Sequence, residues 1–185
     1  LQLSAGELKK VVLGRPTLLG LSWEDNMEPT LASLEKRLQL SAGELKKVVL
    51  RCPTLLGLSW QDNMEPTLRS LKEFLQLSPD ELKKVVLGLP PLLGCSWQDN
   101  MEPMLTSLKE KLQLSPAELK ELVIRAPILL GRRWDSNIGP QIAMMEDAVG
   151  HAGAAIEVKD LILSNPGVLL AGNETRVRPR LAELK

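Results

Sequence analysis

Aromatic and reactive side chains are scarce in this sequence. Its 185 residues contain no tyrosine, one phenylalanine, two cysteines and one histidine. Metal sites and nucleophilic sites usually need clustered cysteine or histidine, whereas Cys52, Cys95 and His151 each lack a partner at such spacing. A glycine-rich phosphate-binding loop and paired carboxylates beside a glycine-rich cleft are also missing. We therefore expect a protein that is not an enzyme and that uses no metal or other cofactor.

Neither charge sign dominates the chain, and long apolar runs are absent. Lys plus Arg and Asp plus Glu both number 23, so the net charge is zero. A neutral total provides no global attraction to phosphate or to anionic lipid. No apolar run approaches the ~18 residues that a membrane span needs, so we expect no membrane span.

Repetition is what the sequence has in abundance. The string Leu-Gln-Leu-Ser begins at residues 1, 38, 75 and 112, and the first two copies differ at only seven of 37 positions. A weaker fifth copy is shifted by two residues, because Pro127 is followed by Pro166. We place the repeats at residues 1–37, 38–74, 75–111, 112–148 and 149–185, with the insertion in a longer loop near Val149–Ala155. Since neither end carries the polar cap that an array normally needs, we expect a single array that is part of a longer protein.

Each repeat carries two helix signatures. In the second copy, Ser41 and Glu44 have the spacing of a capping box, and the apolar residues Leu45, Val48 and Val49 mark one helical face. Pro53 ends this first helix, and residues 53–57 suit a single 3₁₀ turn.

The second helix of the same repeat follows Ser59. Trp60, Met64, Leu68, Leu71 and Leu75 form a narrow apolar stripe. The helix begins either at Trp60, with Pro66 on its solvent side, or later, near Asn63. The pattern predicts an all-α solenoid of about five 37-residue repeats, each with two helices and a 3₁₀ turn.

The order of these motifs is similar to that of a known family. Ser-x-x-Glu-Leu-x-x-Val-Val, then x-Pro-x-Leu-Leu-Gly, then Ser-x-x-x-Asn-x-x-Pro-x-Leu-x-x-Leu recurs along the chain. This resembles the mitochondrial transcription termination factor (mTERF) repeats of mitochondria and plastids. The resemblance implies a curved superhelix that binds double-stranded DNA or structured RNA along its concave side. It also implies a location in a mitochondrion or plastid and a role in transcription, including its termination, or in RNA and ribosome assembly.

Basic side chains are the candidate nucleic-acid contacts. On a helical wheel Lys10 lies about 200° from Leu8, opposite the apolar face, so Lys10, Lys47 and Lys84 form a possible ladder with one rung per repeat. The ladder ends at Glu121, which replaces the lysine in the fourth repeat. Six arginines complete the candidate set: Arg125, Arg132, Arg133, Arg176, Arg178 and Arg180.

The sequence leaves two functions open. No single repeat is strongly basic, and a protein held by several phosphate contacts normally shows a basic excess. The tryptophans share the apolar stripe, so we expect them to pack between repeats rather than stack on bases. The alternative to nucleic-acid binding is a protein-binding scaffold or structural subunit of a large organellar complex.

Overall fold

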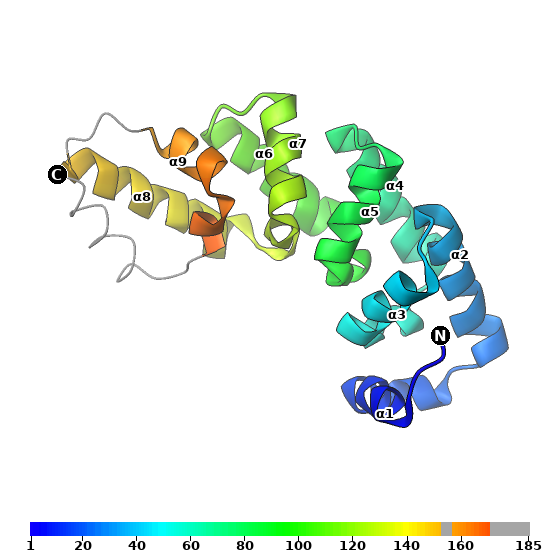
Figure 1. Cartoon of the computed structure of the whole chain (residues 1–185). Coiled ribbons are helices and arrows are strands. Elements are labelled where there is room, and N and C mark those ends of the chain that lie inside the picture. The colour runs from blue at the N-terminus through cyan, green and yellow to red at the C-terminus, as the bar shows by residue number, and fades with distance from the viewer. Residues whose placement is uncertain (153–156, 171–185) are drawn as a thin grey trace. The chain divides into compact units, whose positions relative to one another are not determined.

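The computed structural model describes residues 1–152 and 157–170, and all regular structure in these ranges is helical (Figure 1). The prediction of an all-α repeat array is therefore confirmed. The α-helices within the described residues are α1 (Ala5–Gly14), α2 (Glu28–Leu38), α3 (Ala42–Arg51), α4 (Glu65–Leu75), α5 (Pro79–Gly88), α6 (Glu102–Lys111), α7 (Pro116–Arg125), α8 (Gly139–Ala152) and α9 (Val158–Ser164). None of them is long and apolar enough to cross a membrane.

The chain divides into two compact units, Leu1–Trp97 and Gln98–Lys185. The N-terminal unit contains α1 to α5, and α6 to α9 belong to the C-terminal unit. Each unit has its own core of leucine, valine and methionine side chains contributed by successive repeats.

The predicted capping box begins each of the first helices α1, α3, α5 and α7. In α3 the Glu44 N–H donates to Ser41 Oγ at 3.3 Å, and the Ser41 N–H donates to Glu44 Oε2 at 2.7 Å. This exchange satisfies two backbone donors that a helix start otherwise leaves unpaired. The expected apolar face is buried, with Val48 and Val49 at most 1% exposed.

A short 3₁₀ helix follows each first helix, as expected. The five segments are Pro16–Gly20, Pro53–Gly57, Pro90–Gly94, Pro127–Gly131 and Pro166–Leu170. The proline at the first position has no N–H to donate, so starting a helix there leaves no backbone donor unpaired.

The entry to the second helix is a π-helical turn, and neither predicted starting point describes it fully. Helical backbone begins at Trp60, which Ser59 caps, but Trp60–Met64 is a π-turn and α4 proper starts at Glu65. The Glu65 N–H donates to the Trp60 carbonyl, five residues back. An ordinary α-helix through Pro66 would place its ring against the carbonyl four residues earlier, and the wider turn accommodates the ring. The same turn occurs at Trp23–Met27, Trp97–Met101 and Trp134–Ile138.

The second helices bury the predicted stripe. Met64, Leu68 and Leu71 are fully buried, while Trp60 is half-buried. Helix α4 ends at Leu75, and Gln76, the residue that caps it, has a left-handed φ of 51°. The Leu77 N–H then donates to the Lys72 carbonyl. This αL ending turns the chain into the next capping box.

The loop predicted near Val149–Ala155 is wrong in its first part. Helix α8 continues to Ala152 and has 14 residues, against 11 in α4. The helix continues because no proline interrupts it and alanines at positions 148 and 152 favour it, which offsets the cost of Gly150. Residues 153–156 lie outside the described part of the chain.

Candidate nucleic-acid interface

The three ladder lysines are exposed in the structure. Lys10, Lys47 and Lys84 lie on α1, α3 and α5, one on the first helix of each of three successive repeats. Helices α1 and α3, which carry the first two of these lysines, pack against each other (Figure 1). The N-terminal unit thus presents an exposed ammonium group at the same position of three successive repeats.

Lys46 and Lys83, the lysines immediately before the ladder residues Lys47 and Lys84, have a structural role. Lys83 Nζ lies 2.8 Å from Glu44 Oε2 and donates to the Gln39 carbonyl at 3.0 Å. Both partners belong to the preceding repeat, so this contact joins two repeats. The same arrangement occurs for Lys46 with Glu7 and Gln2, and for Lys159 with Glu118 and Gln113. We call this contact the inter-repeat lysine clamp.

The clamp also explains the electrostatics of the capping acids. Hydrogen bonding to Lys83, together with the Ser41 backbone N–H, lowers the pKa of Glu44 from 4.5 to about 2. The pKa of Glu7 falls to about 2 for the same reasons, with Lys46 first. In Glu118 the Ser115 backbone N–H is the largest cause and Lys159 the second. These carboxylates are turned toward helix ends and paired, so they do not neutralise the exposed lysines.

Two arginines at repeat position 14 cap the next repeat. The Arg51 guanidinium donates to the Leu87 and Gly88 carbonyls at the end of α5, at 2.7 and 3.1 Å. Arg125 likewise donates to the Leu163 and Ser164 carbonyls at the end of α9. Arg125, a predicted nucleic-acid contact, therefore already uses both terminal nitrogens within the protein.

Arg132 and Arg133 are exposed in the C-terminal unit, between a 3₁₀ helix and the π-turn that starts at Trp134. Arg132 also lines a cavity of about 410 Å³. Arg176, Arg178 and Arg180, the remaining candidates, lie outside the described residues.

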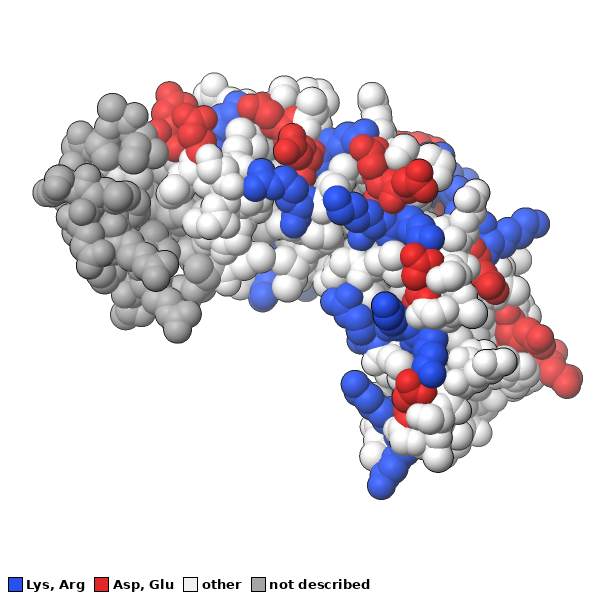
Figure 2. All heavy atoms as spheres, in the orientation of Figure 1, with Lys and Arg blue, Asp and Glu red and all other residues white. Residues whose placement is uncertain are grey.

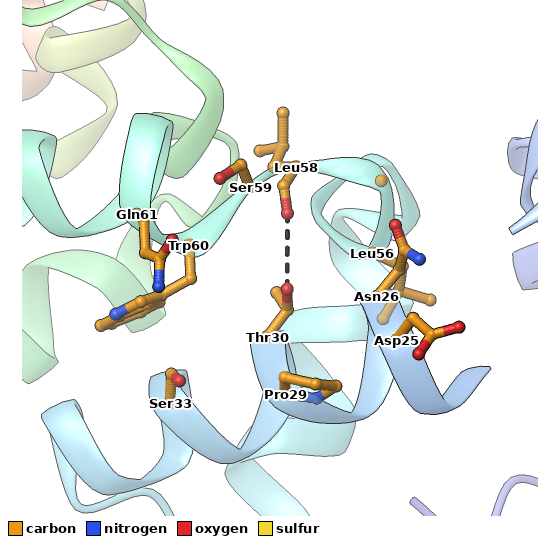
Figure 3. A pocket seen from close by; sticks show the side chains of 11 residues that line it. Asp25, Asn26, Pro29, Thr30, Ser33, Leu56, Leu58, Ser59, Trp60 and Gln61 are labelled. Atoms are coloured by element: carbon orange, nitrogen blue, oxygen red, sulfur yellow. Dashed lines mark hydrogen bonds between the residues drawn. The ribbon is translucent and has the colours of Figure 1, made fainter. Parts of the chain in front are cut away.

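A groove lies between the second helix of repeat 1 and the turns of repeat 2. It has a volume of about 370 Å³. Figure 3 shows Asp25 and Asn26 toward one end, Trp60 and Gln61 toward the other, and Thr30 between them. The Thr30 hydroxyl donates to the Leu58 carbonyl at 3.4 Å across this groove. This hydrogen bond in the groove thus joins repeat 1 to repeat 2.

Charges of both signs are mixed on the surface. Figure 2 shows Lys and Arg side chains lying beside Asp and Glu side chains across the viewed face of the described residues. Groups of three or more histidine, cysteine or acidic side chains suited to a metal ion do not occur among those residues. Cys52 is buried, Cys95 is half-buried, and both thiols are free. Burial raises the pKa of the Cys95 thiol, which keeps it protonated and unreactive.

The sequence did not show that, within a lysine pair, the first lysine contacts the preceding repeat while the second is exposed to solvent. The period gives both lysines the same recurrence, and only contact with the preceding repeat distinguishes them. A signal was nevertheless present, because Lys46 lies closer than Lys47 to the apolar face on the wheel. The arginine caps had a weaker signal, since position 14 holds arginine in some repeats and glycine in others.

These features define the class of protein. A chain of capped helix pairs, joined through a lysine clamp and presenting side chains at a fixed period, is an α-helical repeat protein. It belongs to the mTERF family, whose sequence profile matches residues 1–185, the whole chain. No curated protein matches the sequence closely enough to be compared with it. Members of this family are generally non-enzymatic, nucleic-acid-binding repeat proteins, typically of organelles.

Proposed function

We propose that this chain is a non-enzymatic, organellar nucleic-acid-binding protein that regulates transcription or RNA and ribosome assembly. Its partner is double-stranded DNA or structured RNA. Membership of the mTERF family supports the class of function. The periodic exposure of Lys10, Lys47 and Lys84, beside clamp lysines that are held in ion pairs, supports the mode of binding.

The spacing of the lysines suits a repeating ligand. Each ladder lysine comes from the same position of a nearly identical repeat, so the rungs recur regularly, as backbone phosphates do. An ammonium group acts as a point charge on phosphate and reads no sequence. The ladder therefore supplies affinity and register, and the chain's neutral total limits that affinity to a few phosphate contacts.

The salt dependence of binding tests this proposal. Three lysine contacts give a slope of log K against log[salt] of about −2.7 for duplex DNA, and each further arginine contact adds about −0.9. Lys47→Ala should make the slope shallower by about one unit. Lys46→Ala is the matched control, because it removes the same charge from the neighbouring position but breaks a clamp. It should change the slope much less.

A protein-binding scaffold is the second candidate. The mixed charges on the viewed face and the zero net charge favour it, since protein partners do not require a basic excess. If the protein shows no salt-dependent nucleic-acid binding at low ionic strength, the scaffold account replaces the first. In that case Lys47→Ala should leave every binding measurement unchanged.

A further inference from the structure

One position of the first helices carries opposite charges in the two units. It is the position directly after that of the clamp lysine. In the N-terminal unit a lysine occupies it in each of α1, α3 and α5, namely Lys10, Lys47 and Lys84. In the C-terminal unit a carboxylate occupies it in α7 and α9, namely Glu121 and Asp160. All five side chains are exposed, so the charge that this position presents to solvent differs in sign between the units.

The clamp establishes that Asp160 is the counterpart of the ladder lysines, although the fifth repeat is shifted by two residues. Lys159, directly before it, lies 2.9 Å from Glu118 Oε1 and donates to the Gln113 carbonyl at 3.2 Å. The clamps of repeats 2 and 3 have the same two kinds of partner, a capping glutamate and the carbonyl of a left-handed glutamine. Asp160 also lies in the first turn of α9, where the helix dipole favours an acid. Glu121 therefore carries the stronger argument.

Glu121 presents an unpaired carboxylate to solvent. It lies beyond the first turn of α7, where the helix dipole no longer favours an acid. Arg125 follows four residues later, but its guanidinium donates to the Leu163 and Ser164 carbonyls. Within the described residues Glu121 makes no ion pair. Lysine and glutamate have similar helix propensities, and Lys47 occupies this position in α3, so the stability of the helix does not require an acid here.

We propose that Glu121 and Asp160 confine the phosphate contacts of the first helices to the N-terminal unit. The inference rests on the proposed function and names the residues that set how many repeats the nucleic acid follows. A carboxylate repels a neighbouring phosphate, and like charges brought together in a complex weaken binding and suppress the wrong alignment. The ladder lysines attract the phosphate backbone in three repeats, and the acids repel it at the same position of the next two.

Reversing the charge at Glu121 tests the inference. Glu121→Lys reproduces the spacing of Lys47 and Arg51 in α3, so the helix accommodates it. We expect the slope of log K against log[salt] for duplex DNA to become steeper by about 0.9, the value of one further phosphate contact. The affinity at about 50 mM salt should rise about tenfold. Glu121→Gln removes the negative charge without supplying an ammonium group, and it should give a smaller gain in both quantities.

Glu110→Lys is the matched control. Glu110 is an exposed acid on α6, a second helix of the same unit, so this substitution changes the net charge equally but away from the ladder position. It should change the slope by less than about 0.3, because it adds no phosphate contact. Equal effects of the two substitutions would show that only the total charge matters and would overturn the inference. An unchanged slope in Glu121→Lys would overturn it as well.

Backbone amide NMR locates the contacts directly. Titration of the wild type with duplex DNA should shift the amides of Lys47 and Lys84 and leave the Glu121 amide in place, whereas in Glu121→Lys that amide should shift too. A saturable shift of the Glu121 amide in the wild type would contradict the inference. Failure of the proposed function has a different signature, since the wild type would then show no salt-dependent binding. That result refutes both, while a wild-type slope that Glu121→Lys leaves unchanged refutes this inference alone.

Discussion

At the residue scale, Lys83 and Lys84 are chemically identical neighbours with different surroundings. Lys83 bridges to Glu44 and the Gln39 carbonyl, whereas Lys84 is exposed. We expect Lys83→Ala to lower the free energy of unfolding by about 0.5–1 kcal/mol. Lys84→Ala should stay within about 0.5 kcal/mol of wild type. Urea unfolding measures both, and equal losses would contradict the assignment of the clamp to Lys83 alone.

The lowered pKa of Glu44 predicts a specific loss of stability in acid. Its pKa is 4.5 in ordinary surroundings and about 2 in the folded protein. A depressed carboxyl pKa stabilises the fold above pH 4.5, and that contribution disappears as the pH falls from 4.5 toward 2. Glu44→Gln should therefore flatten the pH dependence of unfolding within this window.

The control for this experiment is Glu121→Gln, which removes an exposed acid from the middle of α7. It should leave the steepness of the acid transition nearly unchanged. A steepness that is the same in wild type and in Glu44→Gln would show that the capping carboxylate is not linked to folding.

At the element scale, the left-handed glutamine that follows each of the second helices α2, α4 and α6 is a point of local backbone strain. Gln39 has a φ of 49°, a conformation that disfavours residues with a Cβ. Gln39→Gly should raise the free energy of unfolding by about 0.5–1 kcal/mol, because glycine adopts this conformation without steric cost. The Gln39 carbonyl that accepts from Lys83 remains available. Gln39→Ala keeps the Cβ and should bring no gain, which thermal unfolding can check.

The arginine caps make a second prediction at this scale. Arg51 donates to two carbonyls at the end of α5, and glycine occupies the same position in repeats 1 and 3. Arg51→Gly should destabilise the fold by about 1–2 kcal/mol. The two hydrogen bonds are lost, and glycine loses more backbone conformational entropy than arginine when the helix forms. Hydrogen exchange should show the loss at the last amides of α3 and α5. An unchanged exchange rate at α5 would contradict the cap.

At the scale of the whole molecule, an array distributes stability through contacts between neighbouring repeats. Leu71 is fully buried in α4, and Leu71→Ala should cost about 2–5 kcal/mol through lost packing and a residual cavity. We expect hydrogen-exchange protection to fall in repeat 2 and in the adjacent helices α2 and α5. Protection of α7, in the C-terminal unit, should be nearly unchanged. A uniform loss over both units would indicate a single cooperative unit instead.

Much of the fold could be predicted from the sequence because its signals are local. Ser41 with Glu44 and Pro53 mark helix limits through contacts between residues a few positions apart, and the structure confirms them. The π-turn at Trp60 could not be predicted, because the sequence identifies the conflict at Pro66 but not which widened turn resolves it. The candidate nucleic-acid contacts could be predicted only as basic residues. Which of them are exposed could not be predicted, because exposure depends on packing against other repeats.

The identical residues Leu8 and Leu45 show most clearly what the sequence alone cannot predict. Both stand at the same position of nearly identical repeats, and the sequence alone determined that each lies on the apolar face of a capped helix. Leu8 is nevertheless 53% exposed and Leu45 only 7% exposed. Only the tertiary structure decided this, because α1 packs against α3 and covers Leu45, while no earlier helix of the described chain covers Leu8. Local sequence sets the helices and their faces, whereas burial and clamp contacts depend on which neighbour each face meets.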